Sequence, residues 1–373
     1  MGKSNTSFTR VVVGGGLFGC YAAIVLADKG HDVLLLEQES GLLTKASFVN
    51  QARLHTGFHY PRSIITAKEA LRNYERFRKR FPAAVRDFEQ IYAISEYNSR
   101  TSGEDFSKFV KGLGSSYEEV DPEKWFFPGK VSRAFRVEEP SFDSAILRKY
   151  VEEELTAHPN ITVKLNTAVI GGTADTTGIE LIHEDMSCTK TDGVVLATYA
   201  GTNSIRRSIN LSPLPLTFEL AEVILGHVQP DLVNLGFTVM DGPFWSLMPF
   251  GHTDLVTLTS VGLTPLLKSD LDAKFDCQSR RNDCTGLKLQ SCTECPVRPI
   301  TAVQHQFQQM SMFLKNASSF IPDRSIFTVK AVLSSSEVDD SRPTLIHRES
   351  NVNVITVFSG KVSTLFDLDS ELT

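Results

Sequence analysis

The sequence has no excess of positive charge. Its 373 residues include 38 Lys and Arg against 44 Asp and Glu, a formal net charge of −6 at pH 7. Domains that bind nucleic acid are normally basic, so this balance argues against nucleic acid as the main partner. One basic run, residues 72–86, is expected to be the solvated face of a helix, with phosphate or partner binding as the alternative.

The sequence also lacks a long uninterrupted apolar segment. Its most apolar stretch near the start, VVVGGGLFGCYAAIVLA, is broken by glycines and follows a polar MGKSNTSFTR. A membrane helix needs about 20 apolar residues in a row, and a secretory signal has a different order of regions. We therefore expect a cytoplasmic protein with no membrane span. The sequence does not predict an oligomeric state.

What is present is ordinary globular composition, with 41% hydrophobic and 22% charged residues. The length predicts two domains. The segment TRVVVGGGLFGCYAAIVLADKGHDVLLLE is the most informative. An apolar strand leads into Gly14, Gly16 and Gly19, which satisfy G-x-G-x-x-G before a helix, and a second strand ends at Glu37. This order is typical of a dinucleotide-binding unit, with the diphosphate at the helix N-terminus and the acid on the ribose.

Three later segments favour FAD over NAD. Residues 160–169, 191–204 and 351–363 each carry an apolar strand that leads toward small or polar turn residues. Such widely separated pieces suit a long ligand across a sheet built from the whole chain. The fold class expected is α/β, with a discontinuous Rossmann-like FAD-binding domain and a second, mainly antiparallel β substrate domain.

These segments resemble, in order, the D-amino-acid-oxidase-like superfamily of FAD-dependent oxidoreductases, which includes glycine oxidase and L-2-hydroxyglutarate dehydrogenase. The pieces are the Gly14–Gly19 turn with Glu37, FDSAILRKYVEEEL, TAV, GVVLATYAGTNS, SRP and FSGKVS. The resemblance implies an FAD domain at 1–86, 138–203 and 329–373. The substrate domain is then 87–137 and 204–328, with a Cys-rich insertion at 277–295.

The resemblance also implies which residues contact FAD. Val169 is expected near the adenine, the Ala197–Gly201 turn near the diphosphate, and residues 360–363 near the flavin. The full implied set is Gly14, Gly16, Leu17, Phe18, Gly19, Glu37, Gln38, Asn50, Arg53, Leu54, His55, Val169, Ala197, Gly201, Gly360, Lys361, Val362 and Ser363.

The segment NQARLHTGFHYPRS, residues 50–63, is similar to a family segment that passes beside the flavin ring, S-R-N-S-G-V-I-H-A-G-[IL]-x-Y. The match lies at Asn50, His55, Gly57 and Tyr60, whereas Gln51 and Ala52 replace a small residue and a glycine. His55 could contact the flavin, act as a base or be attached to it covalently. A neutral loop histidine is the alternative.

Four other positions are candidates for chemistry. Arg342 in the Arg-Pro pair could bind a substrate carboxylate, or pair with Asp339 or Asp340. Lys361 could stabilise negative charge on the reduced ring, or lie exposed on the last helix. Phe244 and Trp245 could form an aromatic wall of the substrate pocket with Tyr60, or pack in the core.

The six cysteines divide into two groups. Cys20 and Cys188 stand alone and are expected to be buried. Cys277, Cys284, Cys292 and Cys295 could hold a structural zinc ion, with free or paired thiols and an iron–sulfur cluster as alternatives.

The function expected is an FAD-dependent oxidoreductase of the amine or amino-acid oxidase or dehydrogenase type. It would transfer a hydride from a C–H beside an amine or hydroxyl of a small, carboxylate-bearing substrate to flavin N5. His55, Arg342 and Lys361 are the candidate catalytic residues. Alternatives are a 2-hydroxy-acid dehydrogenase, a flavin enzyme that acts on a sugar or sugar nucleotide, and a flavin-free binding protein.

Overall fold

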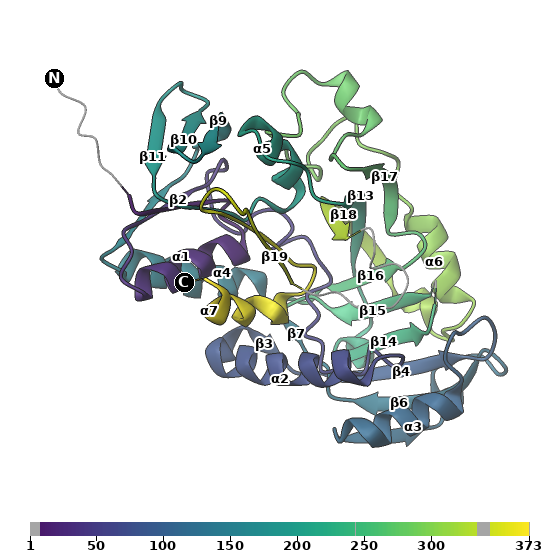
Figure 1. The fold of residues 1–373 in the computed structure, drawn as a ribbon. Coiled ribbons are helices and arrows are strands. Elements are labelled where there is room, and N and C mark those ends of the chain that lie inside the picture. The colour runs from purple at the N-terminus through teal and green to yellow at the C-terminus, as the bar shows by residue number, and fades with distance from the viewer. Residues whose placement is uncertain (1–7, 243, 334–343, 373) are drawn as a thin grey trace.

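The computed structural model describes residues 8–242, 244–333 and 344–372. Arg342 lies outside these residues. The chain forms two main sheets, and one of them contains both purple N-terminal strands and yellow C-terminal strands (Figure 1). The fold is α/β with one parallel and one mainly antiparallel sheet, as expected.

The first main sheet, here called the parallel sheet, has the order β19-β20-β12-β1-β2-β8. All neighbours run parallel except the edge pair β19 and β20. Its strands are β1 (Arg10–Val13), β2 (Val33–Leu36), β8 (Ile161–Lys164), β12 (Val194–Leu196), β19 (Leu345–Arg348) and β20 (Val354–Phe358).

Both faces of the parallel sheet are covered, which explains its continuous apolar strands. Val12 packs with α1 and α4 on one face, whereas Val11 and Val13 pack with β9, β10 and α5 on the other. These elements are α1 (Leu17–Asp28), α4 (Ser144–Ala157), α5 (Thr202–Ser208), β9 (Val169–Asp175) and β10 (Gly178–His183). β11 (Cys188–Thr191) pairs with β10, and α7 (Leu368–Glu371) packs beside α1.

The second main sheet, the large sheet, has the order β17-β13-β16-β15-β14-β4-β6-β5, with β18 also paired to β13. Only β14 and β4 run parallel. The strands are β4 (Glu89–Ser95), β5 (Tyr117–Val120), β6 (Val131–Val137), β13 (Leu216–His227), β14 (Leu235–Met240), β15 (Trp245–Pro249), β16 (Val256–Ser260), β17 (Pro265–Asp270) and β18 (Ile321–Leu333). β18 runs past position 329, the expected domain boundary, because its pairing with β13 continues to Leu333.

The large sheet is also covered on two faces. Ile91 and Ala93 of β4 pack under α6 (Val303–Ser311), whereas Tyr92 and Ile94 point to α2 (Ile64–Arg80) and α3 (Gly103–Leu113). A short pair, β3 (Val85–Arg86) with β7 (Ser141–Phe142), lies where the chain passes between the two main sheets.

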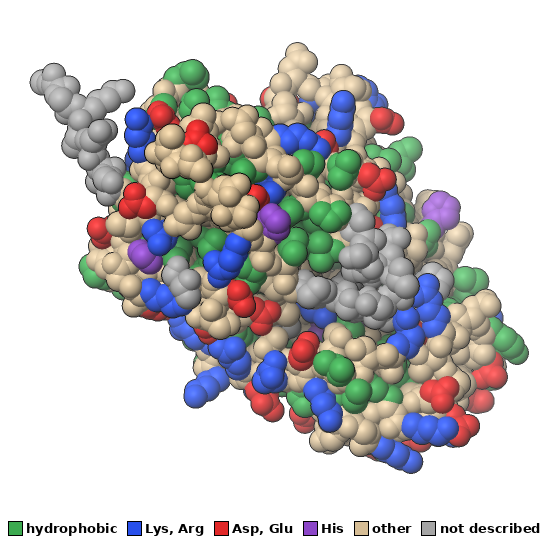
Figure 2. Space-filling model, in the orientation of Figure 1, with side chains coloured by type: hydrophobic (Ala, Val, Ile, Leu, Met, Phe, Trp, Pro, Cys, Tyr) green, Lys and Arg blue, Asp and Glu red, His purple; other side chains and the backbone are tan. Residues whose placement is uncertain are grey.

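The basic run falls on α2 and the turn after it, and several of its arginines have acidic partners. Arg76 pairs with Asp369, Arg78 with Asp87 and Arg80 with Glu154. On the face shown in Figure 2, blue and red side chains alternate over this region, as a solvated helix face predicts. In the described part of the chain, no helix combines the length and apolar character that a membrane crossing requires.

Candidate active site

The glycine turn after β1 is held by close backbone contacts. Gly14 has φ +108°, and a Cβ there would lie 2.5 Å from the carbonyl oxygen of Ala197. A Cβ on Gly19 would lie 1.8 Å from the carbonyl oxygen of Gly14. By contrast, the space beside Gly16 is open except for Ser47 Oγ at 3.4 Å, and the first turn of α1 has no acidic residue. An anion can therefore approach the positive end of α1.

Glu37 lies at the end of β2 beside this turn. Its Oε2 accepts from the Gly15 N–H at 2.5 Å and its Oε1 from the Glu39 N–H at 2.8 Å. A carboxylate offers about four acceptor positions, so capacity for two ribose hydroxyls remains. Burial raises the pKa of Glu37. The Thr167 N–H donates to the Glu37 carbonyl oxygen at 2.8 Å, which brings the start of β9, with Val169, to this edge of the sheet.

The ends of β1, β2 and β12 thus meet around one open turn, and the residues fit a dinucleotide cofactor such as FAD. Ala197 contacts Gly14, and Gly201 follows in the same turn before α5. Leu17 and Phe18 begin α1, and the Leu17 N–H donates to Ser47 Oγ at 3.0 Å. Gln38 donates to the Leu289 carbonyl oxygen at 3.4 Å, so the Cys-rich segment contacts this edge.

The loop of residues 50–63 begins at the same turn. The Asn50 amide donates to the carbonyl oxygens of Ala46 and Ser47 and accepts from the Ala52 N–H at 2.6 Å. Ala52 has φ +56°, a left-handed conformation that explains the family's glycine at this place. The Gln51 amide donates to Thr259 Oγ1 of the large sheet. The loop therefore connects the two sheets.

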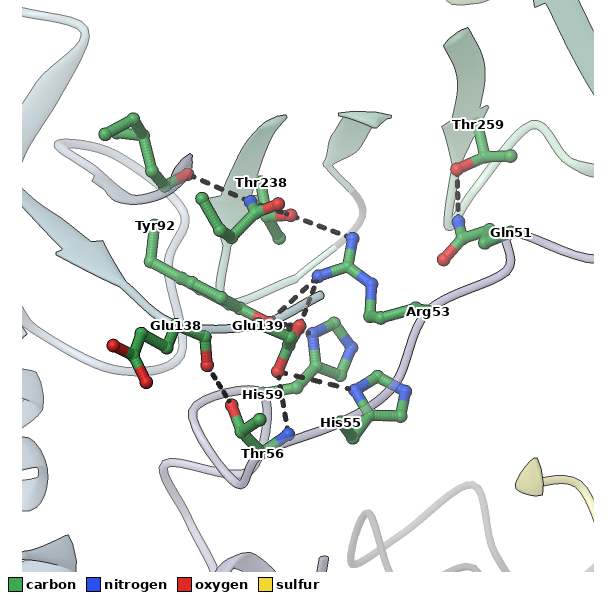
Figure 3. Close-up of polar contacts among 12 residues, drawn as sticks. Gln51, Arg53, His55, Thr56, His59, Tyr92, Glu138, Glu139, Thr238 and Thr259 are labelled. Atoms are coloured by element: carbon green, nitrogen blue, oxygen red, sulfur yellow. Dashed lines mark hydrogen bonds and ion pairs between the residues drawn. The ribbon is translucent and has the colours of Figure 1, made fainter. Parts of the chain in front are cut away.

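Beyond Ala52 the loop encloses a buried ion pair (Figure 3). Arg53 donates to Glu139 Oε1 at 2.8 Å, to the Tyr92 hydroxyl at 2.9 Å and to Thr238 Oγ1 at 2.8 Å. Tyr92 donates to the same carboxylate oxygen, and the Thr56 N–H donates to Glu139 Oε2 at 3.3 Å. Glu139 is fully buried. The guanidinium of Arg53 is therefore bound to protein groups.

His55 lies on the other side of this carboxylate. Its Nδ1 is 3.8 Å from Glu139 Oε2, and one-fifth of its side chain is exposed. Burial lowers the pKa of His55, although the Glu139 carboxylate opposes the shift. The imidazole is therefore neutral at pH 7. The ring of His59 lies 4.9 Å from that of His55, centroid to centroid, at a tilt of 37°, and its Nδ1 is 3.4 Å from the Tyr92 hydroxyl.

The C-terminal turn meets the loop at the same place. The ammonium of Lys361 lies 4.2 Å from the centroid of the Tyr60 ring, and the Tyr60 ring lies 5.2 Å from that of His55. Lys361 is buried, so it is not an exposed lysine of the last helix. Gly360 has open space beside it, and Val362 begins the 3-10 helix η8 (Val362–Asp367). A cation, an aromatic ring and a neutral imidazole are thus clustered.

Comparison with known proteins identifies the family. The model of the family described as "DAO: FAD dependent oxidoreductase" matches residues 10–257. The chain belongs to this family. The assignment supports FAD as the cofactor, in agreement with the open turn at Gly16.

Curated relatives carry a related description. "FAD-dependent monooxygenase kojA" of Aspergillus flavus is 32% identical over 251 residues, which are 64% of this chain and 57% of that protein. "FAD-dependent monooxygenase FPY4" of Fusarium mangiferae is 27% identical over 256 residues, 68% of this chain and 64% of that protein. The match thus spans less than two thirds of these relatives.

Solved structures share the fold. Glycine oxidase from Geobacillus kaustophilus has a TM-score of 0.69 at 14% identity, over 98% of this chain and 92% of that chain. The FAD-bound L-α-glycerophosphate oxidase from Mycoplasma pneumoniae has 0.70 at 14% identity, over 98% and 93%. A mutant of NikD, described as an unusual amino acid oxidase, has 0.71 at 14% identity, over 97% and 92%.

Two predicted pocket residues of this DAO family member lie in the core instead. Trp245 is fully buried and packs against Phe313, as does Phe244, in the cluster under α6. Because alternate strand residues point to opposite faces, Ser246 lies on the face of the large sheet that also carries Thr238 and Thr259, its cross-strand neighbours. The core alternative therefore describes both aromatic residues.

The four clustered cysteines line one cavity in an irregular segment. Among residues 8–242, 244–333 and 344–372, no group of three or more His, Cys, Asp or Glu side chains is arranged to hold a metal ion. All six cysteines are free, and the zinc prediction is not supported. The prediction of a buried Cys188 is wrong, because it begins the edge strand β11 and is exposed.

Sequence reasoning missed the centre of the site, which is Glu139 with Tyr92 and Thr238. Glu139 follows β6 in a run that also contains Glu138, whose side chain is exposed. The apolar residues of β4 are consecutive rather than alternating, so no sequence pattern predicts which face Tyr92 occupies, and none joins it to Arg53.

Proposed function

We propose that this DAO family member oxidises a C–H bond beside an amine or hydroxyl group of a small, carboxylate-bearing substrate. The observation that carries the proposal is that the neutral, part-exposed imidazole of His55 and the buried ammonium of Lys361 both lie against the Tyr60 ring. A base for the departing proton and a cation for developing negative charge are what this oxidation needs from a protein.

The FAD would be held at the carboxyl ends of strands β1, β2 and β12 of the parallel sheet. The Gly14–Gly19 turn and the α1 N-terminus would bind the diphosphate. Glu37 would bind the ribose, and Val169 would lie beside the adenine. The turns at Ala197–Gly201 and 360–363 would complete the site. When bound, FAD supplies the acceptor for the substrate hydride.

The remaining steps belong to the chain's own side chains. Neutral His55 can accept the proton from the substrate amine or hydroxyl, because its pKa is lowered and part of the ring is exposed. Lys361 lies in a buried site, where a charge acts more strongly than in water. Arg342 stays a prediction for the substrate carboxylate.

The test of this function is anaerobic mixing of purified, FAD-loaded protein with glycine, L-proline, 2-hydroxyglutarate and α-glycerophosphate. We expect one donor class to bleach the oxidised flavin absorbance without added reductant. A His55→Ala variant should reduce its flavin about 100-fold more slowly or worse, as loss of a general base does. The matched control is His305→Ala, on the exposed side of α6. A His55→Ala protein with unchanged flavin spectrum and turnover would defeat the proposal.

A second function is favoured by the relatives named FAD-dependent monooxygenases. In that case an oxygen atom of O2 would enter the product, and FAD would first need an external reductant. Turnover in ¹⁸O2 separates the two functions, because monooxygenation puts one labelled atom into the product and the other into water, whereas oxidation at the C–H bond leaves the product unlabelled.

A further inference from the structure

The buried carboxylate of Glu139 has a different task for each oxygen. Oε1 accepts from Arg53 at 2.8 Å and from the Tyr92 hydroxyl. Oε2 accepts from the Thr56 N–H at 3.3 Å and faces His55 Nδ1 at 3.8 Å. The loop thus delivers Arg53 and His55 to opposite sides of one carboxylate (Figure 3).

The carboxylate stays ionised. Burial on its own would raise the pKa of Glu139, but the contact with His55 and the charge of Arg53 hold it well below its usual value. Burial and the neighbouring Glu139 raise the pKa of Tyr92, so its hydroxyl remains a donor. An ionised carboxylate can only accept hydrogen bonds.

The imidazole faces groups of both signs. Glu139 is the acidic group beside it, Arg53 and Lys361 are the cations that act on it, and His59 and Tyr60 lie against its ring. Nδ1 is buried and, within the described residues, has no hydrogen-bond partner at normal distance. A neutral imidazole carries one N–H, and an acceptor beside one ring nitrogen decides which nitrogen holds it.

We propose that Glu139 is a positioning residue that keeps His55 in its Nδ1–H tautomer and thereby leaves Nε2 as the proton acceptor. Arg53, Tyr92 and Thr56 fix the carboxylate so that Oε2 stays turned to the ring. The catalytic consequence rests on the proposed function of His55 as a base, whereas the tautomer does not.

The direct test is ¹⁵N–¹H correlation of histidine-labelled protein, with the His55 signals assigned by their loss in His55→Ala. In the wild type we expect the shifts of an Nδ1–H, Nε2-unprotonated ring at pH 7.5. In Glu139→Gln the amide can turn its NH2 to Nδ1, and the population should move toward the Nε2–H tautomer. Glu138→Gln is the matched control, because it makes the same change at an exposed neighbour and should leave the tautomer unchanged.

The pH profile of anaerobic flavin reduction is a second readout. In the wild type the rate should fall as pH drops through the lowered pKa of His55, because the ring becomes protonated. Glu139→Gln should slow reduction about 100-fold or more, as for a lost general base. Its acid limb should move to lower pH, because the carboxylate no longer favours the imidazolium. Glu139→Asp should restore the Nδ1–H tautomer and part of the rate.

Loss of one partner from a buried ion pair can unfold a protein, so a second variant is needed. Arg53→Met combined with Glu139→Leu removes both charges, so this variant should fold. It should also lose the preference of His55 for the Nδ1–H tautomer. A pure Nδ1–H ring in folded Glu139→Gln and in the double variant would overturn the inference. If no donor reduces the wild-type flavin, the proposed function fails while the tautomer result still stands.

Discussion

At the scale of single residues, the close approach of the Gly19 and Gly14 backbones sets the shape of the Gly14–Gly19 turn, here called the cofactor turn. A side chain there has no room, because the nearest atom to a built Cβ is the Gly14 carbonyl oxygen at 1.8 Å. Gly112 of α3 differs, since a Cβ there meets nothing within 4 Å. A side chain is therefore excluded at Gly19 but can be accommodated at Gly112.

We predict opposite effects for the two alanine substitutions. Gly19→Ala should cost about 3 kcal/mol or more, because the backbone of the turn must move, and should weaken FAD binding. Gly112→Ala, on the exposed side of a helix, should raise stability by about 0.5–1 kcal/mol. Thermal unfolding and the flavin absorbance of each purified variant measure both. A Gly19→Ala protein with normal stability and full flavin content would show that the turn is not as tight as described.

The pH dependence of stability gives a further prediction. The folded-state pKa of Glu139 is depressed, so its contribution is present above the unfolded pKa of about 4.3 and is lost as pH falls below it. The wild type and Glu138→Gln should therefore lose stability steeply between about pH 5 and pH 3, where the unfolded carboxylate takes up its proton. Glu139→Gln should lose it less steeply. Urea unfolding across this range checks the slopes, and equal slopes in all three proteins would contradict the buried ion pair.

Part of the residue-level picture was predictable. The glycine spacing and Glu37 predicted the cofactor turn, and the resemblance at residues 50–63 and 360–363 predicted neighbours that the structure brings together as His55, Tyr60 and Lys361. Glu139 was not predictable, because what distinguishes it from Glu138 is its burial and its contacts with residues that are distant in the sequence. A side chain whose role comes from a partner 86 positions away leaves no local pattern.

At the scale of elements, the start of α4 joins the two sheets. Asp143 is its N-cap, and its Oδ1 accepts from the N–H groups of Ala145 and Ile146 at 2.9 Å. Its Oδ2 accepts from the His252 N–H at 2.8 Å, in the turn between β15 and β16. One side chain thus begins a helix beside the parallel sheet and fixes a hairpin of the large sheet.

We expect Asp143→Ala to cost about 2–3 kcal/mol, the sum of a lost cap and of a backbone donor left without its partner. Ser102→Ala is the comparison, because Ser102 caps only α3, with its Oγ at 3.1 Å from the exposed Asp105 N–H. That change should cost about 1 kcal/mol. Chemical unfolding measures the loss of unfolding free energy in both variants. Equal losses would mean that the contact of Asp143 with the His252 N–H contributes nothing to stability.

Element-level prediction failed where both faces of a strand are buried. Periodicity cannot tell which face of the large sheet each side chain of β15 occupies, because this sheet packs under α6 on one face and against α2 and α3 on the other. Phe244 and Trp245 were therefore assigned to the pocket, although Trp245 points to α6 and its neighbour Ser246 lies on the other face with Thr238 and Thr259.

At the scale of the whole molecule, the loop of residues 50–63 is where the two sheets meet. Gln51 and Arg53 bond to strands β16 and β14 of the large sheet, and Asn50 is held beside the cofactor turn. Arg86 adds bonds to the carbonyl oxygens of Gly251 and Thr253.

The most direct test of this account is the rate of anaerobic flavin reduction by a reactive donor, compared with the same donor carrying deuterium at the carbon to be oxidised. We predict slower reduction with deuterium at saturating donor and at a pH where His55 is neutral, because the C–H bond breaks as the flavin is reduced. Equal rates for the two donors, or turnover only after prior reduction of the flavin, would contradict it.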